Sequence, residues 1–262
     1  MNKKYELTDE TINHWGTTLH RIKALRSFGD VKAGDLGGYI QSEDNLSHEK
    51  DCWIYNDAIA RDNAKVLDNA KVKIAAQILD DAIVFDNATV SGDGIVCDNS
   101  KVYEYAKVFR NAKLTGKCEL FGHAAVSDNV SLHTSAKVYG NAIVQGDACV
   151  TGANIYDKAR VTSGIIVGAT INGNTLIDAD IYLKDNAYIS SISDYTVIIM
   201  NGITVAFYLS ENKDIYLTFG IYEYKLDDLK YVIGLSDNAA FPMMVELAKK
   251  YLLKERNALW KK

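Results

Sequence analysis

Two histidines near the middle of the chain carry the side chain best suited to proton transfer near neutral pH: His123 in LFGHAAV and His133 in VSLHTSA. A neutral imidazole can accept a proton from a hydroxyl or amine that attacks an acyl group, so either residue is a candidate general base. Such chemistry also needs a pocket that holds the substrates beside the base. Whether either histidine can act in this way depends on the elements that position it.

Other reactive groups are too scattered to predict a metal or cofactor site. A catalytic zinc site needs three convergent ligands, yet His14, His20 and His48 all stand within the first 50 residues. The glycine-rich stretch Gly34–Gly38 lacks the Lys-Ser/Thr of a phosphate loop. The four cysteines form no Cys-x-x-Cys pair, so neither a zinc site nor a disulfide framework is expected; they are Cys52, Cys97, Cys118 and Cys149.

The elements that would position these residues follow from a repeat of six residues. Every sixth residue is small or nearly so over sixteen repeats: Ala58, Ala64, Ala70, Ala76, Ala82, Ala88, Gly94, Ser100, Ala106, Ala112, Cys118, Ala124, Val130, Ala136, Ala142 and Ala148. Two residues after each comes a second series, mostly larger aliphatics, which begins Ala60, Val66, Val72, Ile78 and ends Val138, Val144, Val150. The two positions before each small residue are mostly Asp, Asn or Gly, which tolerate the backbone of a sharp corner.

The repeat predicts a β-solenoid. Each unit forms a short strand whose small and aliphatic residues both point inward, followed by a corner. One unit cannot bury its own aliphatic side chain, so the units must stack on copies of themselves. With three strands to a turn, the sixteen units make roughly five turns. An amphipathic helix is excluded because a period of six does not match 3.6 residues per turn.

The pattern resembles the hexapeptide repeat of left-handed β-helices, a fold used by many acyltransferases. The segment His20–Ala58 is similar to the entry segment of a YdcK-like family of bacterial and phage hexapeptide-repeat proteins, and the similarity extends over about residues 5 to 150. Its motifs are Gly37-Gly38, Asn45-Leu46 and Cys52-Trp53-Ile54-Tyr55. The resemblance implies the left-handed winding and a phage or prophage origin.

The ends of the repeat define three expected regions. Residues 1–50 form an N-terminal β cap, with a strand over Leu19–Leu25 and a turn at Gly34–Gly38. Residues 51–192 form the β-helix, which ends after Val150 with one or two imperfect turns. Residues 193–262 form a small α+β module: a three-stranded sheet over Thr196–Met200, Ile203–Leu209 and Ile215–Tyr224, then helices at Leu226–Ile233 and Phe241–Asn257.

The repeat itself weighs against catalysis. The acyltransferases that share this repeat have loops inserted between hexapeptides, and these loops build the pocket walls at subunit interfaces. Between Ala58 and Val150 this sequence contains no insertion. We therefore expect a bare prism without a cleft of several hundred cubic ångströms, and no enzyme activity.

One outward-facing row has the character of an interaction surface. The residue after each aliphatic points outward, and every third such residue, eighteen positions further on, falls on the same face of the prism. One row is apolar throughout: Leu67, Phe85, Tyr103, Phe121 and Tyr139. Such a row on a prism is covered either by the chain's own cap or C-terminal module, by a copy in a dimer or trimer, or by another macromolecule.

The favoured function is a non-enzymatic interaction protein of phage or prophage origin, an inhibitor of a host defence or regulatory protein. The alternatives are an acyltransferase-like enzyme using His123 or His133 with an acyl-coenzyme A donor, and a small-ligand sponge that holds nucleotides between subunits. The formal net charge of -5 argues against broad nucleic-acid binding. No apolar run is long enough to span a membrane and no secretory signal begins the chain, so we expect the bacterial cytoplasm.

Overall fold

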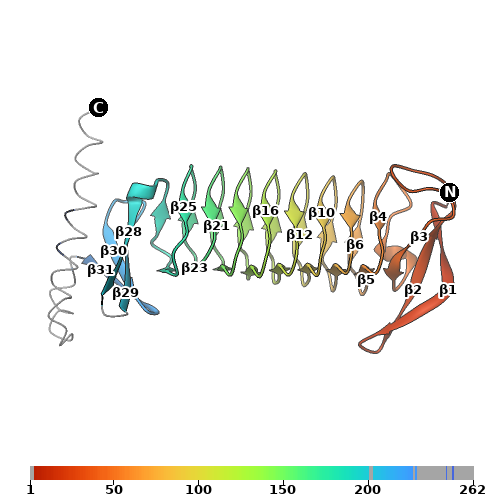
Figure 1. Cartoon of the computed structure of the whole chain (residues 1–262), viewed down its shortest axis with the longest axis horizontal. Helices are drawn as coiled ribbons and strands as arrows, with labels where there is room; N and C mark the ends of the chain where they lie inside the picture. The colour runs from red at the N-terminus through yellow and green to blue at the C-terminus, as the bar shows by residue number, and fades with distance from the viewer. Residues whose placement is uncertain (1–2, 201–202, 227, 229–245, 247–249, 251–262) are drawn as a thin grey trace.

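The chain forms a rod with a different structure at each end (Figure 1). The computed structural model describes residues 3–200, 203–226, 228, 246 and 250. Stacked short strands make the shaft, a three-stranded cap closes the N-terminal end, and a second antiparallel sheet follows the last turn. The predicted mainly β architecture with a parallel β-helix is confirmed.

Strands β4 to β27 stack three to a turn into a left-handed parallel β-helix of about eight turns. Sheet 1 contains β5 (Ile59–Ala60), β8 (Gln77–Ile78), β11 (Ile95–Val96), β14 (Lys113–Leu114), β17 (Ser131–His133), β20 (Cys149–Thr151), β23 (Ile165–Val167) and β26 (Tyr182–Leu183). Sheet 2 contains β4 (Trp53–Ile54), β7 (Lys71–Val72), β10 (Thr89–Val90), β13 (Lys107–Val108), β16 (Ala125–Val126), β19 (Ile143–Val144), β22 (Arg160–Val161) and β25 (Leu176–Ile177). Sheet 3 contains β6 (Lys65–Val66), β9 (Ile83–Val84), β12 (Lys101–Val102), β15 (Glu119–Leu120), β18 (Lys137–Val138), β21 (Asn154–Ile155), β24 (Thr170–Ile171) and β27 (Tyr188–Ile189).

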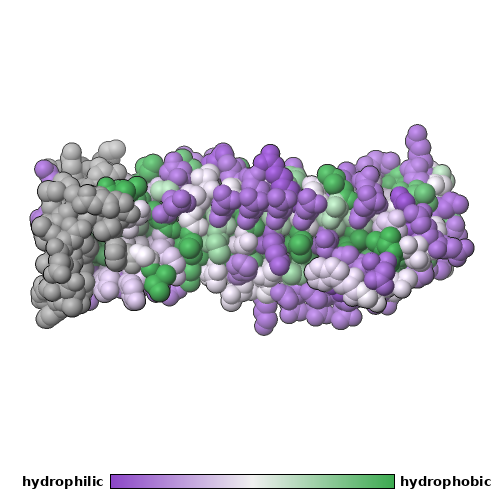
Figure 2. Space-filling model, turned by 60° about the horizontal axis from the view of Figure 1, so that its bottom comes forward, coloured by the Kyte–Doolittle hydropathy of each residue, from purple (hydrophilic) through white to green (hydrophobic). Residues whose placement is uncertain are grey.

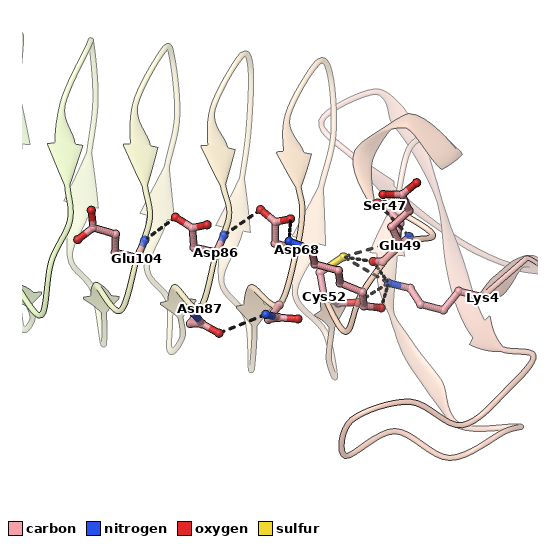
Figure 3. A network of polar contacts seen from close by, with 10 residues as sticks. Lys4, Ser47, Glu49, Cys52, Asp68, Asp86, Asn87 and Glu104 are labelled. Carbon is pink, nitrogen blue, oxygen red and sulfur yellow. Dashed lines mark hydrogen bonds and ion pairs between the residues drawn. The ribbon is translucent and has the colours of Figure 1, made fainter.

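The core is the predicted column of small and aliphatic side chains. Ala106 and Val108 are fully buried, whereas Lys107 between them is exposed. The corners adopt positive φ at acidic residues such as Asp68 (55°) and Asp86 (54°). These carboxylates also accept hydrogen bonds from the next turn: the backbone N–H of Asp86 donates to Asp68 Oδ2 at 3.3 Å (Figure 3). The corner residues therefore permit the bend and also satisfy a backbone donor that the bend leaves free.

The β-helix continues past Val150 to Ile189, within the expected bounds of residues 51–192. Seven more strands, β21 to β27, follow β20, which is slightly more than the expected one or two imperfect turns. The corner at Gly152 is one residue shorter than the others. This shifts the six-residue spacing in the sequence by one position, but the strands remain paired in the same way. Lys137 therefore pairs with Asn154 across seventeen residues, whereas Glu119 pairs with Lys137 across eighteen.

The N-terminal cap extends sheet 1. Strands β1 (Tyr5–His14), β2 (Thr17–Ala24) and β3 (Leu36–Ile40) pair antiparallel, and β3 then pairs in parallel with β5. A short 3-10 helix, η1 (Glu43–Asn45), leads into the first turn. One cluster on this sheet joins cap residues to solenoid residues: Leu19, Tyr39, Ile59, Leu79 and Cys97.

The glycines before the first turn serve close packing. The expected turn is present at Gly34 (φ 92°), but Gly37 and Gly38 lie inside β3. A Cβ on Gly38 would lie 2.2 Å from the carbonyl oxygen of Ala58, and one on Gly37 would lie 2.6 Å from that of Ile54. The prediction of a turn over the whole stretch is therefore wrong, because two of its glycines allow β3 to contact the first turn.

A buried lysine closes the N-terminal end of the core. The side chain of Lys4 is buried, and its Nζ donates to the carbonyl oxygen of Cys52 at 2.9 Å and lies 3.3 Å from Cys52 Sγ (Figure 3). Burial lowers the pKa of Lys4, whereas the backbone carbonyls around Nζ satisfy its donors. The apolar column is thereby separated from solvent by a polar end group.

The C-terminal sheet has four strands instead of three. After the 3-10 helix η2 (Ile192–Asp194) come β28 (Tyr195–Met200), β29 (Ile203–Leu209), β30 (Ile215–Phe219) and β31 (Tyr222–Lys225), all antiparallel. The expected single strand over Ile215–Tyr224 is broken by a turn at Gly220 (φ 56°). The helices expected at Leu226–Ile233 and Phe241–Asn257 lie outside the described residues apart from isolated positions. No helix among the described residues is long and apolar enough to cross a membrane.

Candidate interaction surface

Five aromatic rings stack along one corner of the β-helix, and we call this row the aromatic ladder: Phe85, Tyr103, Phe121, Tyr139 and Tyr156. Adjacent ring centroids lie 4.8 to 5.0 Å apart and the planes differ by 1° to 8°. Every ring is partly exposed, and Leu67 continues the row toward the N-terminal end. The structure therefore brings together all five residues singled out in the sequence and adds Tyr156.

The repeat positions the ladder. Each of its residues follows the buried aliphatic of a sheet 3 strand and begins the corner that leads to sheet 2, so parallel pairing stacks them one per turn. A fixed count of eighteen residues misses Tyr156, because the shortened corner at Gly152 moves it forward by one position. The shifted pair Ala153 and Ile155 was the available signal, since Tyr156 directly follows that aliphatic.

The stack determines which part of each ring is available. Because the rings lie face to face along the rod, their faces are occupied by one another and their edges point outward. Sugars and nucleobases bind aromatic side chains mainly through the ring face. Edges of phenylalanine and tyrosine rings instead suit apolar and polar side chains of a protein surface.

A polar frame fixes the middle of the ladder. The hydroxyl of Tyr103 donates to Glu119 Oε2 at 3.2 Å, and Lys137 Nζ lies 3.0 Å from the other oxygen of that carboxylate. The bond to Lys137 lowers the pKa of Glu119, so the carboxylate is charged at neutral pH. Burial, together with Glu119, raises the pKa of Tyr103 to about 12, so the phenol keeps its proton.

The two ends of the chain do not cover this corner within the described residues. The cap strands continue sheet 1 at its N-terminal edge, and the C-terminal sheet contacts the last turns through β26 and β27. On the side of the rod shown in Figure 2, hydrophilic side chains form rows along the shaft with smaller apolar patches between them. The ladder, with Leu67, forms an apolar row over six consecutive turns of its corner.

The covered row shows how the chain treats an outward apolar position. At the corner after sheet 1 the same repeat position holds Arg61, Leu79 and Cys97, and the two apolar residues are buried in one cluster with cap residues. Further along the rod this row is polar, with Thr115, His133 and Thr151. The apolar residues of that row are therefore buried. The ladder, in contrast, stays aromatic through five turns.

A hollow beside the ladder corrects one expectation. A concavity of about 570 Å³ lies on sheet 2, so the prediction of a prism without a cleft of this size is wrong. Tyr105 and His123 stack at 4.9 Å and stand above the sheet, whereas the outward residue next to them is the small Ala125. The remaining lining residues are Asn87, Lys107, Phe109, Asn141 and Ile143.

The two candidate bases are not brought together. His123 lies exposed at the ladder corner, stacked on Tyr105, and among the described residues it forms no hydrogen bond with a carboxylate. His133 lies on another face, where its Nδ1 is 2.8 Å from Thr115 Oγ1. A general base is normally held by an orienting partner, as well as by its substrate. Neither histidine has the setting of an assembled catalytic site.

One group of possible metal ligands occurs among the described residues, and it does not fit a metal well. Ligand atoms of Asp80, Cys97 and Asp98 lie within 4.8 Å of one another. Burial raises the pKa of the Cys97 thiol to about 11, so the thiol keeps its proton, whereas a metal needs the thiolate. Asp80 Oδ2 already accepts the backbone N–H of Asp98 at 3.2 Å.

A second hollow, of about 380 Å³, lies where sheet 1 meets the C-terminal sheet. Ile165 and Tyr182 of the last turns, Ala206 of β29 and Thr218 of β30 line it, and two carboxylates, Asp147 and Asp180, stand at its edge. The acidic edge disfavours a nucleotide, since phosphates and carboxylates repel one another.

The chain matches no family model, and no curated protein is found to be similar to it.

Proposed function

We propose that this chain is a non-enzymatic β-helical scaffold that acts by protein–protein contact along the aromatic ladder. The observation that carries the proposal is the contrast between the two corner rows. In the row after sheet 1 the two apolar residues, Leu79 and Cys97, are buried, whereas the ladder is aromatic and partly exposed from Phe85 to Tyr156. Exposed aromatic rows of this size mark binding surfaces, and aromatic residues carry most of the energy at such interfaces.

The rigidity of the ladder favours binding further. Each inner ring is held between two neighbours at about 5 Å, so little side-chain freedom remains to be lost when a partner docks. Binding that orders a flexible side chain costs roughly 0.5–1.5 kcal/mol for each one. A ladder that is ordered before contact avoids most of this cost. In the finer form of the proposal, the chain is of phage or prophage origin and inhibits a host defence or regulatory protein by covering its surface.

Site-specific photo-crosslinking in the bacterial host tests the proposal. A photoreactive residue in place of Phe85 or Tyr139 should crosslink to the same protein, whether that protein is a host protein or a second copy. Replacing Tyr103 and Phe121 by Ser should abolish both crosslinks without unfolding the chain. Phe109 is the matched control, because it is a partly exposed aromatic on a different corner. Equal crosslinking from Phe109, or none from the ladder, would contradict the proposal.

An acyltransferase-like activity is the second candidate, because the hollow of about 570 Å³ contains His123. A coenzyme A thioester bound there should raise the melting temperature, by an amount set by its concentration relative to Kd. His123→Ala should remove that shift, whereas His133→Ala on the other face should not. The main proposal expects no shift with acetyl-coenzyme A for any of the three proteins.

A further inference from the structure

The order of residue types along the ladder corner is almost the same from either end of the rod. Its axis of reversal lies between the turn of Tyr103 and the turn of Phe121. Turning a second copy end over end would place Tyr103 opposite Phe121, Phe85 opposite Tyr139, and Leu67 opposite Tyr156. Apolar residues would then meet apolar residues at all six positions. A two-fold interface needs such self-complementarity, since the same patch supplies both sides.

The acidic row beside the ladder obeys the same reversal. The residue after each ladder residue is Asp68, Asp86 or Glu104 in the N-terminal half, and Gly122, Gly140 or Asp157 in the C-terminal half. Reversal places each of the two inner acids opposite a glycine. The outermost acid, Asp68, falls opposite Asp157 of the other copy, but it already forms an ion pair with Lys50 at 2.7 Å, which compensates its charge. Two copies can thus approach near the axis without setting carboxylates against each other, and at the outer ends Asp157 meets a carboxylate that is already paired.

Sheet 3 adds a specific charge pair. Lys101 of β12 and Glu119 of β15 both point outward and are neighbours in the parallel register. Reversal about the same axis places Lys101 of each copy opposite Glu119 of the other. Glu119 is held in place by Tyr103 and Lys137, so its carboxylate is already oriented. Two opposite-charge contacts therefore flank the axis.

We infer that the ladder binds a second copy of this chain in an antiparallel, two-fold dimer; this rests on the proposed function and names its partner. A parallel trimer is disfavoured by charge. The exposed lysines Lys101, Lys107 and Lys113 all lie on one turn, one on each sheet, and parallel packing would bring turns of equal height together. Lysines would then meet lysines, whereas antiparallel packing sets this turn against the turn of Glu119.

The available surface suffices for a modest dimer. Six positions at one turn each span about 24 Å. Together with the outward side chains of sheet 3, such a strip buries on the order of 1,200 Å² between two copies, which is the lower end of the range for specific complexes. The association is therefore expected in the micromolar range, and protein concentration controls the dimer fraction.

Charge reversal gives a decisive test by analytical ultracentrifugation. Lys101→Glu alone leaves only glutamates at the two contacts, and Glu119→Lys alone leaves only lysines, so each variant should dimerise at least about tenfold more weakly than the parent chain. An equimolar mixture of the two should restore a dimer that contains one of each. Lys107→Glu, at an equally exposed lysine of the same turn on sheet 2, is the matched control and should dimerise like the parent.

A second measurement does not depend on charge. Mixing Tyr103→Cys with Phe121→Cys under mild oxidation should give a disulfide-linked heterodimer more readily than either variant alone, because reversal sets these positions opposite each other. A parent chain that stays monomeric at high micromolar concentration overturns the inference, as does a dimer in which the mixture of charge variants fails to associate. If the ladder of a monomeric parent still crosslinks to a host protein, the proposed function stands and the dimer fails.

Discussion

The corner row after sheet 1 and the aromatic ladder after sheet 3 occupy the same position of the same repeat, yet only the first has its apolar residues buried. Leu79 and Cys97 are buried in a cluster that includes cap residues, whereas Phe121 and its neighbours are partly exposed. The first row is part of the fold's own stability, and the second is a surface with no cover in the described chain. The cost of a mutation should therefore fall on folding in one row and on association in the other.

Disrupting the contact between the cap and the first turn should give the largest loss of folding stability. Gly38→Ala places a methyl group 2.2 Å from the backbone carbonyl of Ala58, which cannot move without breaking the first turn. We expect about 3 kcal/mol of destabilisation, measured as a shift in the urea midpoint. Leu36→Ala is the control, because this residue lies in the same strand and is 50% exposed. If Gly38→Ala unfolds at the parent midpoint, β3 does not need this close contact.

The comparison of the two rows is sharpened by one substitution in each. Leu79→Ser should destabilise the chain by about 2 kcal/mol, because it removes a side chain that is only 8% exposed. Phe121→Ser should cost the dilute monomer only about 1 kcal/mol, since it removes two stacking contacts from a partly exposed ring.

Sedimentation of the same two variants should show the opposite order of effects, because association depends on the ladder and not on Leu79. Leu79→Ser keeps the ladder and should associate like the parent chain, whereas Phe121→Ser should be monomeric. If Phe121→Ser destabilises the dilute monomer as much as Leu79→Ser does, the ladder belongs to the fold rather than to an interface.

The sequence predicts the shaft far better than its ends, for a physical reason. A strand and a corner repeat every six residues, so the sequence contains sixteen examples of each repeat position. The core, the corners and five ladder residues therefore follow from local rules. Tyr156 was missed because one deleted residue changes the count while the pairing of strands absorbs it. Gly37, Gly38 and Lys4 depend on contacts between distant segments that occur once, and no periodicity reports them. The hollow beside His123 depends on side-chain heights around Ala125, which the repeat does not set.

The smallest expected effect concerns the hydrogen bonds of Asp30, which join the cap to the shaft. Asp30, in the loop between β2 and β3, accepts hydrogen bonds from Lys71 Nζ at 2.8 Å and from the hydroxyl of Tyr55 at 2.6 Å. These contacts lower the pKa of Asp30 to about 2. This value lies below the pKa of about 4 expected in the unfolded chain. The hydrogen bonds of the Asp30 carboxylate therefore contribute fully to stability above pH 4, and this contribution is lost as the pH falls through 2.

Hydrogen exchange as a function of pH separates the cap from the ladder. In the parent chain, amides of β3 should lose protection relative to those of β12 and β15 between about pH 4 and 2, because only the cap depends on this carboxylate. Asp30→Asn should abolish that difference by making β3 less protected already at pH 6. The effect should be small, since the Asp30 side chain is about half exposed and its ion pair is screened by solvent. Equal loss of protection in β3 and β12 would show that acid loosens the whole rod, and that the covered and uncovered sides are not independent units.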